Sequence, residues 1–205
     1  MGPREVLMRK ISVSTVLTAA VVVFVPAMAE AGPPLICHPF QTGHAELLPW
    51  GTGPGWNTPD HRYDVQRLTE DTLRLLSADA PVLTRMEVMR RAVIYAAKDA
   101  RVADQLLTVV VARAAGAGET NALAQFDAGY LIESLKQASH LLGRQVTTAD
   151  GYARVNRALQ MSGGHAEMEF AAALMTTGAV STRHLQRARA SGESLLARNI
   201  TNVGW

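Results

Sequence analysis

The sequence contains a single cysteine, Cys37, among its 205 residues. One cysteine cannot close an internal disulfide, so the fold must be held together by packing alone. Four states remain for Cys37: a free thiol, a bridge between two copies of the chain, a metal ligand, or a small buried hydrophobe. A dimer through Cys37 is therefore one of the assemblies that the sequence allows.

Long apolar runs are absent apart from residues 11–25, near the N-terminus. Arg4, Arg9 and Lys10 precede this run, and the stretch AMAEA, with small residues in A-x-A spacing, follows it. A basic start and an apolar run shorter than the roughly 20 residues that span a bilayer are typical of a secretory signal peptide. We therefore predict a signal peptide over residues 1–31, and a secreted or periplasmic mature chain without stable membrane insertion.

Neither sign of charge dominates the chain. There are 20 Lys and Arg against 18 Asp and Glu, and the loss of three basic and two acidic residues with 1–31 leaves 17 against 16. Nucleic acids and anionic membrane surfaces are bound by clustered positive charge. The sequence therefore argues against both partners, and the remaining 174 residues suffice for one domain with its own core.

Alternation of apolar and polar residues with a period of two, the pattern of strands, is also missing, whereas apolar residues recur at helical spacing from Tyr63 onward. Prolines, glycines and capping residues divide this pattern into segments. We predict an all-α domain over residues 58–205, with six to seven antiparallel helices arranged as a bundle or a short α-solenoid. The expected helices cover residues 63–75, 81–93, 102–116, 119–142, 150–162, 165–177 and 181–199, the last with a break at Ser191-Gly192.

Catalytic motifs are missing as well. The sequence has no Gly-x-Ser-x-Gly elbow and no phosphate-binding loop after a strand. The segment that starts at His165 lacks the second histidine of a zinc protease, so we interpret Glu167 and Glu169 as acids at a solvated helix start. His140 and His184 stand alone and are interpreted as surface or interhelical residues. An unrecognised hydrolase is the least favoured functional class.

What the sequence does have is a Pro/Gly/Trp-rich arm, residues 32–57, between the predicted signal peptide and the helices. Its adjacent Cys37 and His38, with His44 as a further ligand, suit Zn, Cu or haem iron. The covalent haem signature is incomplete, because the first cysteine of Cys-x-x-Cys-His is missing. The favoured interpretation has no cofactor and treats the arm as a strap across the helices, with six apolar side chains packed inward: Ile36, Phe40, Leu47, Leu48, Trp50 and Trp56.

A binding role follows from the same residues. Aromatic and arginine side chains are the usual anchors of protein interfaces. We predict a partner-binding surface that combines Trp50 and Trp56 with Arg85, Arg90 and Arg91, which lie off the apolar stripe of the second helix. The sequence thus favours a secreted helical scaffold that binds another protein or peptide without catalysis, over a metal- or haem-binding protein.

Overall fold

The computed structural model describes Gly2 and residues 34–205, and helices are the only regular elements in this part of the chain. The predicted all-α class is confirmed. The signal peptide predicted for residues 1–31 lies, apart from Gly2, outside the described residues. The elements are α1 Pro34–Cys37, the 3₁₀ turn η1 Val65–Arg67, α2 Leu68–Leu75, α3 Val82–Ala96, α4 Ala100–Gly116, α5 Ala122–Gln137, α6 Ser139–Leu142, α7 Gly151–Met161, α8 Ala166–Met175, α9 Gly178–Arg189 and α10 Ser194–Asn202.

Capping residues set the helix boundaries. Asp99, Asn121 and Asp150 each accept a hydrogen bond from a backbone N–H of the first turn that follows. The predicted break at Ser191-Gly192 is present, because Gly192 adopts a left-handed φ of 69° between α9 and α10. The predicted helix over 119–142 is instead two elements, α5 and the four-residue α6.

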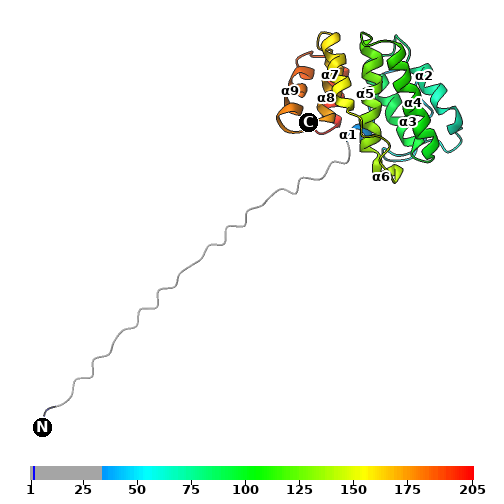
Figure 1. The fold of residues 1–205 in the computed structure, drawn as a ribbon. Helices are drawn as coiled ribbons and strands as arrows, with labels where there is room; N and C mark the ends of the chain where they lie inside the picture. The colour runs from blue at the N-terminus through cyan, green and yellow to red at the C-terminus, as the bar shows by residue number, and fades with distance from the viewer. Residues whose placement is uncertain (1, 3–33) are drawn as a thin grey trace. The chain divides into compact units, whose positions relative to one another are not determined.

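The long helices form layers around a central set. Helices α3, α5 and α8 contact one another, and α2, α4, α7 and α9 pack on them. Figure 1 shows these elements side by side, from α2 in cyan to α9 in orange. Packing joins consecutive helices, such as α8 and α9, and also helices far apart in the sequence, such as α3 and α8.

The arm lies against the central helices. Its short helix α1 contacts α3, α5 and α8, and Leu35, Ile36, Phe40 and Leu48 are buried in the common core. Burying a large apolar side chain contributes roughly 1.5–3 kcal/mol, which offsets the cost of ordering a Pro- and Gly-rich segment. Of the six side chains expected to pack inward, Ile36, Phe40 and Leu48 are buried, whereas Leu47, Trp50 and Trp56 are only partly buried against the core.

Because the arm and the outer helices cover the central helices from several sides, these helices are buried around almost their whole circumference. In α3 every residue except Arg91 is buried. In an amphipathic surface helix, charged side chains lie on the face exposed to solvent. In these buried helices the charged side chains are enclosed and must be paired.

One such pair joins α3 to α5. Arg85 donates from Nη1 to Asp127 Oδ2 at 2.7 Å, and the two side chains are 1% and 3% exposed. Arg85 also donates to the carbonyl oxygens of Ala80 and Ser77. The other carboxylate oxygen of Asp127 has no hydrogen-bond partner among the described residues. Burial raises the pKa of Asp127 to about 6, against the opposing pull of Arg85.

This shift predicts a pH dependence of stability. The pKa of Asp127 is higher in the folded state than the roughly 3.9 of an unfolded aspartate, so the folded state binds the proton more tightly between these values. Relative to the variant Asp127→Asn, the free energy of unfolding of the wild type should fall by about 2 kcal/mol as the pH rises from about 4 to about 7. Urea unfolding of both proteins across this range measures the difference, and parallel pH profiles would contradict the prediction.

Candidate functional site

A buried ionic cluster on α3 holds the arm in place. Arg90 forms a two-pronged pair with Glu87, through Nε at 2.8 Å and Nη2 at 2.9 Å. Arg91 donates from Nε to the same carboxylate at 2.8 Å. Glu87 and Arg90 are both 0% exposed. Residues three and four apart share a helix face, so this sequence spacing brings the three charges together.

The cluster reaches the arm through backbone groups. Arg90 Nη1 donates to the carbonyl oxygens of Ile36 and Trp56, and Glu87 accepts from the backbone N–H of Phe40. Arg91 donates to the carbonyl oxygen of Leu48 at 2.6 Å. Hydrogen bonds to charged groups are stronger than those between neutral groups. The arm lacks the regular backbone hydrogen bonds of a helix or sheet, so these bonds to charged side chains satisfy its backbone groups and fix its position.

Trp50 sits over this cluster. The guanidinium carbons of Arg90 and Arg91 lie 5.1 and 5.2 Å from the centre of the Trp50 ring, within cation–π range. Tyr95 meets the same ring edge-on at 5.7 Å. Tyr95 also donates its hydroxyl to the carbonyl oxygen of Pro49, next to Trp50. The half-buried indole is thus fixed from several sides.

The structure brings four of the five residues that the sequence grouped close together, but it does not expose them as one surface. Trp50 lies over Arg90 and Arg91, and the Trp56 carbonyl oxygen accepts from Arg90. Arg85 and Arg90 are 1% and 0% exposed and bond within the domain, so they are not surface residues. The expectation of an exposed arginine face on α3 is wrong, because Arg85 is enclosed with Asp127 of α5 and Arg90 is covered by the arm. Trp50, Trp56 and Arg91 are only partly buried and stay accessible from solvent.

The predicted metal ligands are not gathered into a cluster. Among residues 34–205, no group of three or more His, Cys, Asp and Glu side chains is placed to hold a metal ion. Burial raises the pKa of the half-buried Cys37 thiol, while burial and the nearby Arg90 lower the pKa of His38. His44 is exposed. The surroundings of Cys37 therefore favour the neutral thiol, which is a poorer ligand than the thiolate.

A groove opens beside Trp50. Its volume is 390 Å³, and it is formed by the loop that leads from the arm to η1. The backbone N–H of Gly51 donates to the carbonyl oxygen of Thr58 at 2.9 Å and closes the loop. A Cβ on Gly51 would lie 2.8 Å from that same oxygen, so the close approach requires glycine. The lining residues are Trp50, Gly51, Thr52, Gly53, Thr58, Pro59, Asp60, His61 and Arg62.

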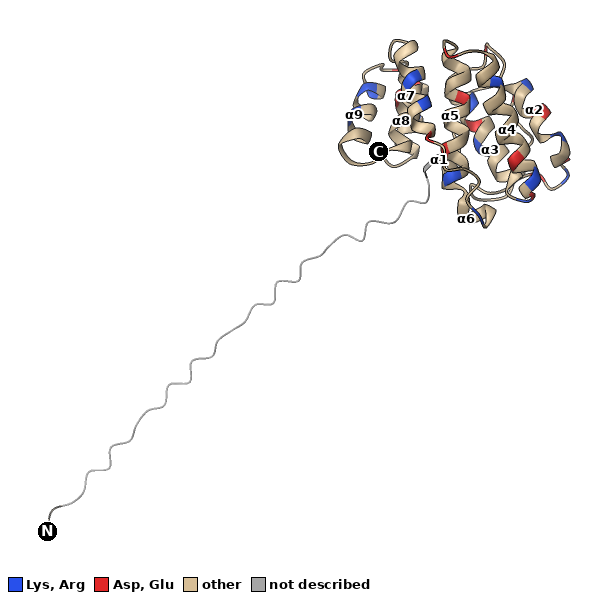
Figure 2. Ribbon diagram, viewed as in Figure 1, with Lys and Arg blue, Asp and Glu red and all other residues tan. Residues whose placement is uncertain are grey.

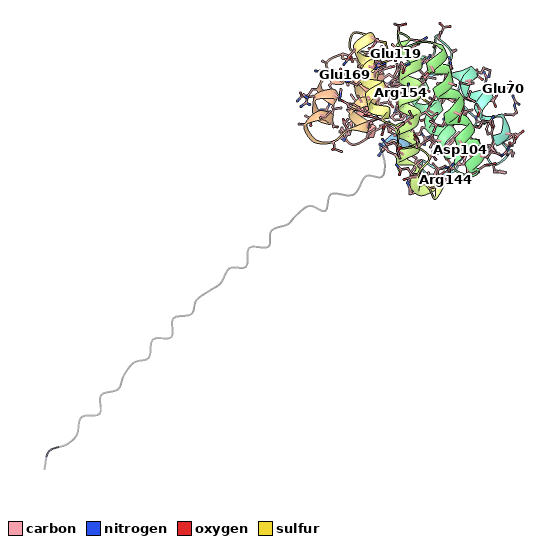
Figure 3. All side chains as sticks on the ribbon, in the orientation of Figure 1. Glu70, Asp104, Glu119, Arg144, Arg154 and Glu169 are labelled. Atoms are coloured by element: carbon pink, nitrogen blue, oxygen red, sulfur yellow. The ribbon has the colours of Figure 1, made fainter. Side chains whose placement is uncertain are left out.

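A second polar cluster, which the sequence did not predict, joins α7, α8 and α9. The Tyr152 hydroxyl lies 2.8 Å from His184 Nε2, and His184 Nδ1 is hydrogen-bonded to Glu169 Oε2. Arg187 Nη1 contacts the other oxygen, Glu169 Oε1, at 3.4 Å. Glu169 is on the side of the domain formed by these helices, away from Glu70 on α2 (Figure 3).

The structure agrees with one expectation and corrects another. His184, expected at the surface or between helices, lies between helices: it is 5% exposed and contacts Tyr152 on α7 and Glu169 on α8. Glu167 and Glu169, expected at a solvated helix start, are 8% and 4% exposed, so these two acids are not solvated. Glu167 instead accepts from the backbone N–H of Leu83 at the start of α3. Helix α8 belongs to the central layer, and its acids are therefore enclosed by α3 and α9.

The Tyr152 phenol is kept protonated in the second cluster. Burial, with a contribution from Glu169, raises its pKa. The phenol can donate to His184 Nε2 in the tautomer whose ring proton is on Nδ1, facing Glu169. Helix α9 carries Arg183, Arg187 and Arg189 and no Asp or Glu (Figure 2).

No helix in the described residues is long and apolar enough to cross a bilayer. The chain was compared with protein-family models, curated proteins and solved structures, and none of them matches it.

Proposed function

We propose that this chain is an exported helical scaffold that binds another protein through the groove beside Trp50, without catalysis of its own. Export rests on the signal-peptide pattern of residues 1–31. Partner binding rests on one observation: Trp50 is accessible along the groove, yet its ring is fixed by Arg90, Arg91 and Tyr95.

A fixed aromatic ring favours binding because little rotamer freedom is lost when a partner packs on it. Trp and Arg are the commonest interface hot spots. The groove also offers His61 and Arg62, both exposed. Within the described part of the chain, the only salt bridge of Arg62 is with the neighbouring Asp60. This combination of one ring, two polar side chains and an irregular backbone suits an extended segment of a partner protein.

Site-specific photo-crosslinking tests the proposal. A benzophenone amino acid at Thr52, an exposed groove residue, should capture a discrete partner in the cell that makes the protein. The change Trp50→Ala should reduce this capture by about tenfold or more, because a hot spot contributes about 2 kcal/mol or more. Helical circular dichroism should remain, since the core helices do not depend on the indole.

Two controls make the result specific. The same benzophenone at Gln105, exposed on α4, should capture no partner. Trp205→Ala removes another tryptophan, 38% exposed and outside the groove, and should leave capture at Thr52 unchanged. Equal capture from positions 52 and 105, or full capture by Trp50→Ala, would contradict a binding role for this groove.

A further inference from the structure

A pocket of 510 Å³ lies beside the cluster of Tyr152, His184 and Glu169, and its residues differ from those of the Trp50 groove. Helix α7, the turn that follows it, the central helix α8 and helix α9 all contribute to its walls. Its size falls in the range of small-molecule sites. The lining residues are Asn156, Leu159, Gln160, Gly163, Gly164, Glu169 and Arg187.

Sequence spacing explains how polar groups converge here. Tyr152, Asn156 and Gln160 are four residues apart along α7 and so share one face. His184 and Arg187 are three apart on α9 and share another. The first face brings two side-chain amides to the pocket, and the second brings a guanidinium.

Glu169 is a positioned carboxylate within this pocket. Its Oε2 is bonded to His184, which is itself bonded to Tyr152, so the carboxylate is held through two further side chains. Its Oε1 has only the 3.4 Å contact with Arg187 among the hydrogen bonds of the described residues. One oxygen therefore fixes the group and the other keeps capacity to accept a stronger hydrogen bond.

Arg187 is the solvent-exposed half of this pair. Its side chain is 65% exposed, whereas that of Glu169 is 5% exposed. A ligand with only a negative charge would be repelled by the Glu169 carboxylate, and a ligand with only a positive charge would be repelled by the Arg187 guanidinium. A ligand with both charges close together would satisfy each and replace one long contact by two charge-assisted hydrogen bonds.

We propose that this pocket binds a free α-amino acid. Its ammonium group donates to Glu169 Oε1, and its carboxylate accepts from the Arg187 guanidinium. The amides of Asn156 and Gln160 hydrogen-bond the remaining polar atoms, and Leu159 contacts the ligand's side chain. This site goes beyond the proposed partner binding, because it shares no lining residue with the groove beside Trp50.

Titration of the ¹⁵N-labelled full chain with L-alanine, L-leucine and L-glutamine, followed by NMR, tests the proposal. At least one of them should produce saturable shifts of the Gly163 and Gly164 amide signals, with a Kd of about 1 mM or below. The N-acetyl and C-amide derivatives of that amino acid each lose one charge and should bind at least about tenfold more weakly.

Matched variants assign the charges. Arg187→Ala should weaken binding at least about tenfold, while Arg189→Ala, two residues along and outside the pocket, should bind like the wild type. Glu169→Gln should weaken binding similarly, and Glu119→Gln, an exposed acid, should not. Three results would each overturn the proposal. The first is the absence of saturable shifts with all three amino acids at about 10 mM. The others are an N-acetyl or C-amide derivative that binds as tightly as the free amino acid, and a folded Arg187→Ala with wild-type affinity.

Discussion

Replacing Arg90 by alanine should lower the free energy of unfolding by about 3–5 kcal/mol, the range for breaking a buried ion pair. Arg90 is fully buried and makes two hydrogen bonds to Glu87 and two to arm carbonyls. The substitution leaves both carbonyls without their charged donor and removes half of the charge that compensates Glu87. Urea unfolding, followed by circular dichroism, measures the loss.

The arm should respond before the helices do. Limited proteolysis of Arg90→Ala should cut within residues 38–56 much faster than in the wild type, while the helical signal persists at low denaturant. Arg101→Ala is the matched control, because its side chain is 72% exposed and should change stability by less than about 0.5 kcal/mol. A loss below about 1 kcal/mol in Arg90→Ala would contradict the role of this cluster in holding the arm.

The helices could be predicted because their signals are local. Asp99, Asn121 and Asp150 cap the first turns of α4, α5 and α7, and Gly192 ends α9 with a left-handed residue. Each of these signals lies within a few residues of the boundary that it sets. No distant contact is needed to identify them.

The environment of α3 could not be predicted in the same way. Its arginines lie off the apolar stripe, which in a helix with one solvent face places them in water. The arm, some 30 to 55 residues away in sequence, covers Arg90 instead, as its bonds to Ile36 and Trp56 show. Arg85 is enclosed by its pair with Asp127 on α5, 42 positions away. The sequence signal that was available is Glu87, which can pair with both Arg90 and Arg91 at helical spacing.

The polar cluster beside the pocket was missed for a related reason. Tyr152 and His184 are 32 positions apart, and nothing local in the sequence links them. Glu169, however, stands in an otherwise largely apolar helix, AEMEFAAALM. A helix that is apolar around most of its surface is buried, and a buried acid requires a partner. An acid within an otherwise apolar, buried helix was therefore the sequence signal that indicated a polar cluster.

The second large effect on stability should come from Gly129, where α5 crosses α7. A Cβ at this position would lie 2.5 Å from the carbonyl oxygen of Gly151 and 2.9 Å from side-chain atoms of Arg154 and Val155. Real Cβ atoms essentially never come this close to a backbone oxygen. Because a carbonyl cannot move aside as a flexible side chain does, an added methyl group must push the two helices apart.

Gly129→Ala should therefore lower the free energy of unfolding by about 2–3 kcal/mol. Helix propensity alone acts in the opposite direction, since alanine is about 1 kcal/mol more favourable than glycine inside a helix. Any net loss thus measures the forced separation of α5 and α7 rather than a local effect on α5. Thermal and urea unfolding of the variant give its size.

Gly116→Ala provides the matched control for this prediction. Gly116 is also helical, at the end of α4, and a Cβ there meets nothing within 4 Å. This variant should be as stable as the wild type or more stable by up to about 1 kcal/mol. If Gly129→Ala behaved like Gly116→Ala, the helix crossing at Gly129 and Gly151 would be looser than the structure describes. A loss confined to Gly129→Ala would instead show that this close backbone contact sets how closely α5 and α7 pack.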